Sequence, residues 1–432
     1  MKKLLKFFVP TIGLLLALGL VSCNPSSGGT PGTEDVTQGS DTGDSGVVIP
    51  PDDGGDDDEE RIAEGGWDLA AQTLKAVSGF ESVGVYSAEF DGEYLLNNVI
   101  AADLTTAGEL VTYLKNHVPD RKTVEDAEYN LDIQVKGAAC SSIVAKNKTE
   151  GTSGYIYGRN FDWDDGPSLI LHTRPIDGYE SISTCFLPFI DEGWENKSNT
   201  EKGAEALSCI YVPMDGMNEK GLYIANLQND TAPMEIPEQL DATKTYVQTT
   251  VAIRYILDNC QTVEEAVNWL KTITMCPVYS DFRDEEGNPE YPDYHFAIAD
   301  NTGKYVVAEW INGEFKTKED RVCTNHSLVD YTDPETLDPE VDRSSYERYD
   351  ALTKIGKDSN WELTSTEVRD ALKAVQKSNS VWSAVFEPGA KRVTYYFRKA
   401  DPHAGIDTTD PDAVQAADKV PMDYTKPVVV QF

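Results

Sequence analysis

Short apolar runs rich in β-branched and aromatic residues dominate the chain after residue 138, and such runs are typical of strands. Glycine, asparagine and aspartate separate them, and these residues favour turns. We expect strands in the runs SSIVAK, SGYIYGRNFDW, ALSCIYVPM, GLYIANLQ, YHFAIAD and KYVVAEW. The segment VWSAVFEPGAKRVTYYFRK predicts a hairpin that turns at Pro388-Gly389.

Helical spacing of apolar residues occurs before, between and after these strands. WDLAAQTLKAV and AGELVTYLKNHV predict a small helical segment over residues 61–135, and two helices are expected between Thr243 and Thr274. Thr262 with Glu265, and Thr364 with Glu367, have the spacing of capping boxes. Strands on both sides of a helical block favour an α+β layered fold over alternating βαβ units.

The N-terminus predicts export. Three lysines precede an apolar segment over residues 7–21, which is the arrangement of a secretory signal. The sequence Leu-Val-Ser-Cys ending at Cys23 resembles a bacterial lipobox. This resemblance implies removal of residues 1–22, lipidation of Cys23 and an extracytoplasmic protein anchored in the cell envelope. An ordinary signal peptide or a short membrane anchor is the alternative.

Residues 23–60 predict an acidic, disordered tether. From residue 24 to residue 60 there are eleven acidic residues and no lysine or arginine. The acidic run lacks the spacing of an EF-hand loop, so we do not expect a calcium site there. Without the signal lysines and the tether, residues 61–432 still carry a net charge of −29, which argues against nucleic-acid binding.

Seven cysteines set a further constraint, at positions 23, 140, 185, 209, 260, 276 and 323. Six remain if Cys23 carries lipid, and in an exported chain that even number permits disulfides. No pair has CxxC spacing, so neither a zinc site nor a redox dithiol is supported, and no metal is expected. Cys209 and Cys260 lie in apolar patterns and are expected as core thiols.

Cys140 raises the main chemical question, because it is a structural thiol, half of a disulfide or a nucleophile. Arg159, Asn160 and Asp162 follow it closely in sequence. On a regular strand Arg159 and Asp162 point to opposite faces, so the strand end must bend if both serve one site. A structural ion pair is the simpler explanation of these charges.

Several blocks, taken together, resemble one family. They are CSSIVAK with GYIYGRNFDW, PMDGMNEKGLYIANLQ, VCTNHSL, RSSYERYDAL and the closing WSAVFEPGAKRVTYYFR, in this order over residues 140–398. The set resembles the choloylglycine hydrolase and acid ceramidase-like group of N-terminal-nucleophile (Ntn) amidases. The resemblance implies an αββα sandwich of two antiparallel sheets between helical layers.

The resemblance also implies self-cleavage between Ala139 and Cys140. Residues 61–139 would be a helical propeptide or small subunit, and residues 140–432 the catalytic domain. The freed α-amine of Cys140 would act as the base for its own thiol. No cofactor is implied.

Residue roles follow from the same resemblance. Cys140 would be the nucleophile, Asp162 would orient its α-amine, and Arg159 would favour the thiolate. Asn325 would donate to the oxyanion, and Arg348 would support the site, although a surface charge on a helix is its simpler explanation. The family often has asparagine where Gln228 stands, so Gln228 and Asn229 are both candidates for substrate binding.

The expected function is hydrolysis of a linear, non-peptide amide of an acylated small molecule through an acyl-enzyme at Cys140. Bile-acid conjugates, N-acyl amines and penicillin V-like amides belong to the substrate class. Acyl transfer by the same fold and non-catalytic binding of amphiphiles are the alternatives. A papain-like protease using His295 or His326 is the weaker one, because the local papain signature is absent.

Overall fold

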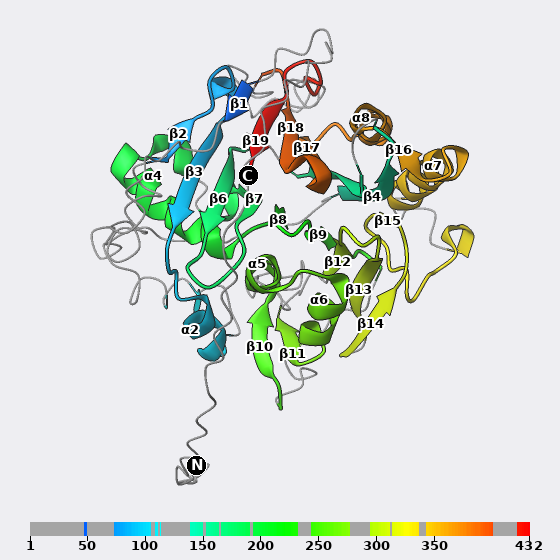
Figure 1. The fold of residues 1–432 in the computed structure, drawn as a ribbon, viewed down its shortest axis with the longest axis horizontal. Coiled ribbons are helices and arrows are strands. Elements are labelled where there is room, and N and C mark those ends of the chain that lie inside the picture. The colour runs from blue at the N-terminus through cyan, green and yellow to red at the C-terminus, as the bar shows by residue number, and fades with distance from the viewer. Residues whose placement is uncertain are drawn as a thin grey trace, which may run out of the picture. The chain divides into compact units, whose positions relative to one another are not determined.

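Two main sheets form the centre of the computed structural model (Figure 1). The structure describes residues 47–49, 73–104, 109–110, 113, 139–149, 153–163, 166–190, 193–231, 243–276, 294–311, 313–336, 343–400 and 421–432. Contacts divide the chain into units 1–43 and 44–432, and all of these residues lie in the second. The predicted α+β class is confirmed for this unit.

The first sheet carries the strand that contains Cys140. Its order is β1 (Val47–Ile49), β19 (Val428–Gln431), β18 (Arg392–Phe397), β17 (Ser380–Glu387), β5 (Tyr155–Asp162), β4 (Ala139–Asn147) and β15 (Val322–Cys323), and β16 (Glu362–Leu363) also pairs with β4. β4 and β5 are antiparallel, as are β17 and β18, so the hairpin predicted at the end of the chain is confirmed.

The second sheet is made mainly from the middle of the chain. Its order is β14 (Glu314–Lys318), β13 (Tyr305–Ile311), β12 (Tyr294–Ala299), β9 (Tyr223–Gln228), β8 (Asp215–Asn218), β7 (Ser181–Phe186), β6 (Ser168–Arg174), β3 (Val85–Asp91) and β2 (Lys75–Ala76). A separate parallel pair joins β10 (Thr245–Gln248) to β11 (Ile273–Cys276).

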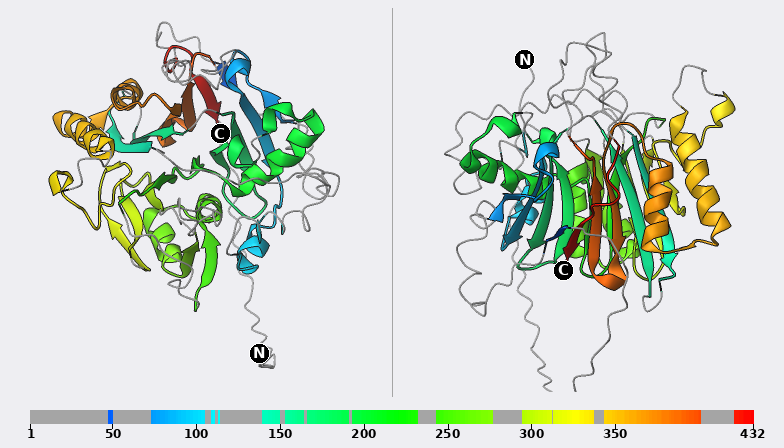
Figure 2. Two further views of the ribbon diagram at one scale, coloured as in Figure 1. Left: turned by 180° about the vertical axis from the view of Figure 1, so that it is seen from behind. Right: turned by 90° about the horizontal axis from the view of Figure 1, so that it is seen from above.

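Helices cover the outer face of each sheet. The helices are α2 (Leu96–Ala101), α4 (Asn199–Ala206), α5 (Thr249–Asn259), α6 (Val263–Leu270), α7 (Ser344–Asp358) and α8 (Ser365–Ala374). α7 and α8 pack on β4, and α8 also packs on β5 and β17, whereas α5 packs on β8 and β9 (Figures 1 and 2). β4 contacts β9 between the sheets, so the layer order is helix, sheet, sheet, helix.

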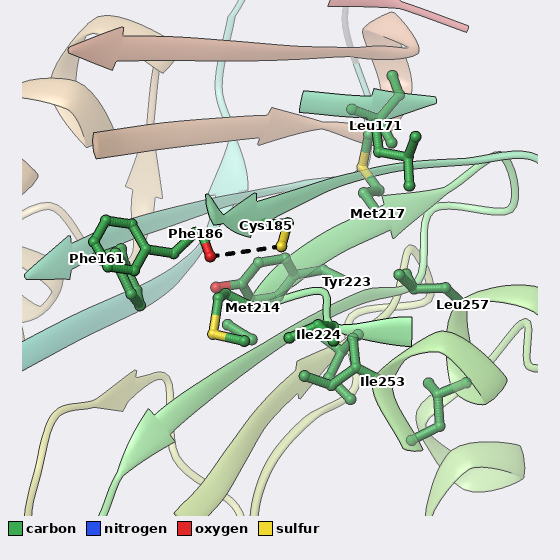
Figure 3. Close-up of a cluster of buried hydrophobic side chains, with 14 of the residues drawn as sticks. Phe161, Leu171, Cys185, Phe186, Met214, Met217, Tyr223, Ile224, Ile253 and Leu257 are labelled. Carbon is green, nitrogen blue, oxygen red and sulfur yellow. Dashed lines mark hydrogen bonds between the residues drawn. The ribbon is translucent and has the colours of Figure 1, made fainter. Parts of the chain in front are cut away.

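The side chains between the sheets form the main core. Tyr157 of β5 stacks on Tyr223 of β9 with ring centroids 5.1 Å apart, and the Tyr223 hydroxyl lies 3.0 Å from Ser142 Oγ of β4. Figure 3 shows Phe161 and Phe186 beside this region, with Tyr223 and Met214 next to each other. The opposite face of β4 and β5 packs Ile143 and its neighbours against α8.

At the residues that the structure describes, the N-terminal part departs from two predictions, although α2 is helical as expected. The segment expected as a helical propeptide contributes strands: Lys75–Ala76 forms β2, and β3 pairs in parallel with β6 along seven residues. Val47–Ile49, inside the expected disordered tether, pairs with β19, because a β-branched triplet interrupts the acidic run. Most of residues 107–118 lies outside the described residues, although Glu109, Leu110 and Tyr113 are helical.

Most predictions for the later strands and helices are confirmed. The strands expected around residues 143, 158, 225, 297 and 308 are confirmed, as are the helices between 243 and 274. The capping box at Thr364 is complete; at the start of α6, Thr262 accepts from the N–H of Glu265, but the Glu265 side chain accepts from Gln261 instead. The strand expected around Cys209 is wrong, since residues 207–211 form a 3₁₀-helix.

The signal segment, Cys23 and most of the tether lie outside the described residues. Within the described part of the chain, no helix has both the length and the apolar character that crossing a membrane requires.

Gly158 marks a close approach between β5 and α8. A Cβ atom at this position would lie 2.7 Å from Val368 Cγ1 and 3.0 Å from Ile143 Cγ2. We predict that Gly158→Val lowers the free energy of unfolding by about 1–3 kcal/mol, because the added methyl groups overpack this contact. Adding Val368→Ala should restore part of the loss. Denaturant titration in a Cys140→Ala background checks this, and unchanged stability of Gly158→Val would contradict it.

Candidate active site

The first residues of β4 place Cys140 at the edge of the space between the sheets. Ala139 pairs with Asp162 and Cys140 pairs with Phe161 on the neighbouring strand. The Cys140 side chain is only 3% exposed. The bond between Ala139 and Cys140 therefore lies at the very beginning of a strand, and cutting it would leave the rest of the β4–β5 ladder intact.

Arg159 brings a buried positive charge to the thiol. Its Nη2 lies 3.6 Å from Cys140 Sγ, and its Nη1 donates to the carbonyl of Met214 at 2.9 Å. Nε lies 3.0 Å from Oδ2 of Asp215, whose side chain is fully buried like that of Arg159. The carboxylate of Asp215 thus balances the guanidinium charge beside Cys140.

Asn325 and Arg348 hold the backbone of Cys140. Oδ1 of Asn325 accepts from the N–H of Cys140 at 2.7 Å and from Arg348 Nη2 at 2.8 Å. Nη1 of Arg348 donates to the carbonyl of Cys140 and, at 2.8 Å, to Ser141 Oγ. Arg348 is 6% exposed, so the simpler explanation as a surface charge on a helix is wrong.

Asp162 lies at the end of β5 beside the same strand start. Its Oδ1 accepts from the hydroxyl of Ser380, while Oδ2 is buried and has no hydrogen-bond partner among the described residues. The pairing of β5 with β17 shifts register between Ser380 and Trp382, opposite this strand end. The extra residue lies in β17, whereas β5 keeps a regular register with β4 up to Asp162, so the bend that the sequence analysis required is not seen in β5.

Gln228 and Asn229 reach the cluster in different ways. The backbone carbonyl of Gln228 accepts from Asn325 Nδ2 at 2.8 Å. Alternation along β9 places the Gln228 side chain on the face opposite Tyr223, away from β4. Asn229 is 3% exposed, and its Nδ2 has no hydrogen-bond partner among the described residues.

The uncut chain does not activate the thiol. Burial raises the pKa of Cys140 to about 11, although the charge of Arg159 and a hydrogen bond from the Asp162 backbone act in the opposite direction. Burial also raises the pKa of Asp162, against the influence of Arg348 and Ser380. At neutral pH the thiol is therefore protonated and needs a base.

Sequence reasoning did not assign roles to Asp215, Ser380 or Trp382. Asp215 accepts from Trp382 Nε1 at 3.0 Å and pairs with Arg159. The signal for Asp215 was available, because it lies in the block PMDGMNE that carries the family resemblance. Ser380 had no such signal, because only the strand pairing brings it to Asp162.

The two histidines considered for a papain-like site have other partners. Nδ1 of His295 lies 3.0 Å from Glu309, and its Nε2 lies 2.7 Å from the carbonyl of Thr324. Nδ1 of His326 lies 2.9 Å from Ser345 Oγ. These contacts give neither histidine the place of a base for Cys140.

The five cysteines whose side chains are described, 140, 185, 209, 260 and 323, are buried free thiols. The predictions of core thiols at Cys209 and Cys260 are confirmed. Among the described residues, no three histidine, cysteine or acidic side chains lie together so that they could hold a metal ion.

We predict that Asp215→Asn destabilises the chain by about 3–5 kcal/mol, because it leaves the buried Arg159 without its ion-pair partner. The control is Glu362→Gln, which breaks an exposed pair with Lys146 and should barely change stability. Denaturant titration of both in a Cys140→Ala background checks the prediction. Equal, small effects of the two substitutions would contradict it.

Comparison with known proteins gives one family match. Residues 210–401 match the family described as acyl-coenzyme A:6-aminopenicillanic acid acyl-transferase. The match includes Asn325 and Arg348 but begins after Cys140, Arg159 and Asp162. No curated protein matches the chain.

Solved structures give weaker likenesses. A mutant of conjugated bile acid hydrolase from Clostridium perfringens is 16% identical over 60% of this chain and 89% of that one, with a TM-score of 0.41. Penicillin V acylase from Agrobacterium tumefaciens is 16% identical over 60% of this chain and 83% of that one, with a TM-score of 0.39. The N-acylethanolamine-hydrolyzing acid amidase ortholog of Caenorhabditis elegans is 14% identical over 58% of this chain and 93% of that one, with a TM-score of 0.37.

Residues 210–401, which carry Asn325 and Arg348, are thus similar to the acyl-coenzyme A:6-aminopenicillanic acid acyl-transferase family.

Proposed function

We propose that this protein is a self-processing Ntn amidase with Cys140 as its nucleophile. It would cut its own chain between Ala139 and Cys140 and then hydrolyse the linear amide bond of an acylated small molecule. The observation that carries the proposal is the convergence on Cys140. Asn325 accepts from its N–H, Arg348 donates to its carbonyl, and Arg159 lies beside its thiol.

The cleavage would proceed in two balanced steps. The thiol sulfur attacks the carbonyl carbon of Ala139, the C–N bond breaks, and the thiol proton ends on the new α-amine of Cys140. Water then hydrolyses the resulting thioester, which releases the Ala139 carboxylate and returns the thiol. The Arg159 guanidinium near the sulfur would favour the thiolate in the first step.

Cleavage supplies the base that the uncut chain lacks. An α-amine has a pKa of about 7.7–8.0, far below that of the buried thiol, and it would lie on the same residue. Oδ2 of Asp162 has no hydrogen-bond partner within the described part of the chain and would accept from this new amine, because Asp162 pairs with the residue that precedes Cys140. Asp162 would thus orient the amine toward the thiol.

Two asparagines would stabilise the oxyanion during attack on the substrate amide. Nδ2 of Asn325, which donates to the carbonyl of Gln228 in the uncut chain, would be one donor. Nδ2 of Asn229 is buried and has no partner among the described residues, and a buried donor without a partner is costly unless a ligand uses it. We therefore assign the second donor to Asn229 rather than to the side chain of Gln228.

The N-terminal segment would stay bound after cleavage. β3 pairs with β6 along seven residues inside the second sheet. Tyr94, only 2% exposed, donates to Asp258 through its hydroxyl, and its carbonyl accepts from Tyr211. Removing this segment would expose a sheet edge and leave these buried partners unpaired.

Acyl transfer to an amine is the second candidate, favoured by the name of the matching family. The same acyl-enzyme would form, and an amine in place of water would release it. We further propose that Cys23 is lipidated after removal of residues 1–22, so that the acidic segment tethers the enzyme to the cell envelope outside the cytoplasm.

We predict that the purified protein hydrolyses at least one acyl amide in a panel of bile-acid conjugates, N-acyl amines and penicillin V. The Cys140→Ala variant should hydrolyse none. Asn229→Ala should lower kcat by about 10²–10³-fold with little change in KM, because it removes a donor used mainly in the transition state. Release of acid and amine is measured by chromatography, with and without an added acceptor amine.

Asn226→Ala is the matched control, because Asn226 lies on β9, just before Asn229, but on the face opposite Tyr223. It should keep kcat within twofold. Mass spectrometry of quenched wild-type enzyme should find the acyl group on the chain that begins with Cys140. Turnover by the Cys140→Ala variant would contradict the proposal, and binding of substrates without turnover or adduct would favour a passive amphiphile-binding protein.

A further inference from the structure

The segment Thr324–Val329 carries Asn325, and the proposed site depends on where that side chain lies. The segment directly follows β15, a strand of only two residues. Such a short strand cannot fix the position of a side chain beyond its end. The segment must therefore be held by contacts from neighbouring elements.

The first set of contacts comes from α7. Ser345 Oγ accepts from the N–H of Asn325 at 2.8 Å and donates to Thr324 Oγ1 at 3.1 Å. Arg348, one turn later, donates to Asn325 Oδ1. These contacts hold the segment from the side of the first sheet.

The second set comes from Glu309 and His295, which lie on the adjacent strands β13 and β12. Oε1 of Glu309 accepts from the N–H of Leu328 at 2.9 Å, and Oε2 accepts from Ser327 Oγ at 2.6 Å and from the N–H of Val329 at 3.1 Å. Nε2 of His295 lies 2.7 Å from the Thr324 carbonyl. Together they contact the segment at its beginning and at its end.

The geometry requires a charged pair. Nδ1 of His295 faces a carboxylate and Nε2 faces a carbonyl, so both ring nitrogens must carry a proton. Burial alone would lower the pKa of His295, but Cys323 and Glu309 raise it well above the usual range. Burial alone would raise the pKa of Glu309, but its hydrogen bonds with His295 and Ser327 lower it to about 2. Both side chains are fully buried.

This cluster is unsuited to chemistry of its own. Cys323 Sγ lies 3.4 Å from His295 Nε2, but the thiol is 1% exposed and burial raises its pKa. The proton on Nε2 is already donated to Thr324. A histidine that holds both protons cannot act as a base for the thiol.

We infer that Glu309 and His295 are positioning residues that fix the segment Thr324–Val329 and thereby hold Asn325 against Cys140. The inference rests on the proposed function, in which Asn325 takes part in self-cleavage and amide hydrolysis. The two residues act through the backbone carbonyl of Thr324 and the N–H groups of Leu328 and Val329. They touch neither the scissile bond nor the substrate.

The first test measures self-cleavage of the full chain by intact mass over time. Glu309→Gln should slow self-cleavage at least tenfold. The NH₂ group of the glutamine would face the N–H and O–H donors that now bind the Glu309 carboxylate. The matched control is Asp258→Asn, which alters a buried carboxylate paired with Arg254 outside the site. If the two variants lower the thermal unfolding midpoint by similar amounts, Asp258→Asn should change the rate of self-cleavage less than twofold.

Two substitutions of His295 test whether its hydrogen bond to the Thr324 carbonyl is the contact that matters. Glutamine places its amide nitrogen near the position of Nε2, and asparagine places it near that of Nδ1. His295→Gln should therefore keep the bond to Thr324 and cleave at least fivefold faster than His295→Asn. Equal rates, or the reverse order, would overturn the inference, as would slowing that only follows the loss of stability.

The second test needs no cleavage. In a Cys140→Ala background, hydrogen exchange of the peptide that contains Leu328 and Val329 should rise at least tenfold with Glu309→Gln and less than twofold with Asp258→Asn. Unchanged exchange would overturn the inference while leaving the proposed function intact. If unsubstituted wild type stays whole, the proposed function fails first, and the inference that rests on it fails as well.

Discussion

Two buried arginines converge on Cys140, and the arrangement of the site follows from the hydrogen-bond and ion-pair partners that their buried guanidinium groups require. Arg159 is paired with Asp215 and bonded to the Met214 carbonyl, and Arg348 is bonded to Asn325 and to the backbone of Cys140. A buried cation without partners would cost several kcal/mol, so these partners are obligatory. Asp215 lies on β8 and Asn325 follows β15, so partners from separate elements hold the two arginines at the start of β4.

The same constraint connects the fold to the proposed chemistry. The uncut chain keeps Cys140 as a protonated thiol, yet it surrounds that thiol with a positive charge and with acceptors for N–H groups. Such an environment would favour a new α-amine at the strand start, because Oδ2 of Asp162, opposite Ala139, has no hydrogen-bond partner among the residues that the structure describes. In the proposed mechanism, burial would keep the thiol inert before cleavage, and the same surroundings would hold the α-amine that cleavage would create.

The sequence predicted the parts of this structure that local patterns encode. Alternation and turn residues were sufficient for β5, β9 and the closing hairpin, and capping residues marked the start of α8. Cys140, Arg159, Asp162, Asn325 and Arg348, named from family blocks, do come together in one cluster.

The missed features depend on long-range pairing. β3 forms a strand because it pairs in parallel with β6 along seven residues. The local sequence pattern around β3 does not encode this pairing. Cys209 lies in an apolar run that a strand and a 3₁₀-helix share equally well. Ser380 and Glu309 become important only through the strands β17 and β13 that carry them to Asp162 and to the segment after β15. No spacing in the sequence reports such contacts.

The most direct measurement is intact mass with N-terminal sequencing of residues 61–432, purified beside a Cys140→Ala variant, followed by native mass spectrometry. The account predicts a new chain beginning Cys-Ser-Ser-Ile in the wild type, absent from the variant and still bound to the fragment that carries β3. A wild-type chain that stays whole after mild acid or reductant would contradict the account, because the α-amine of Cys140 would never form.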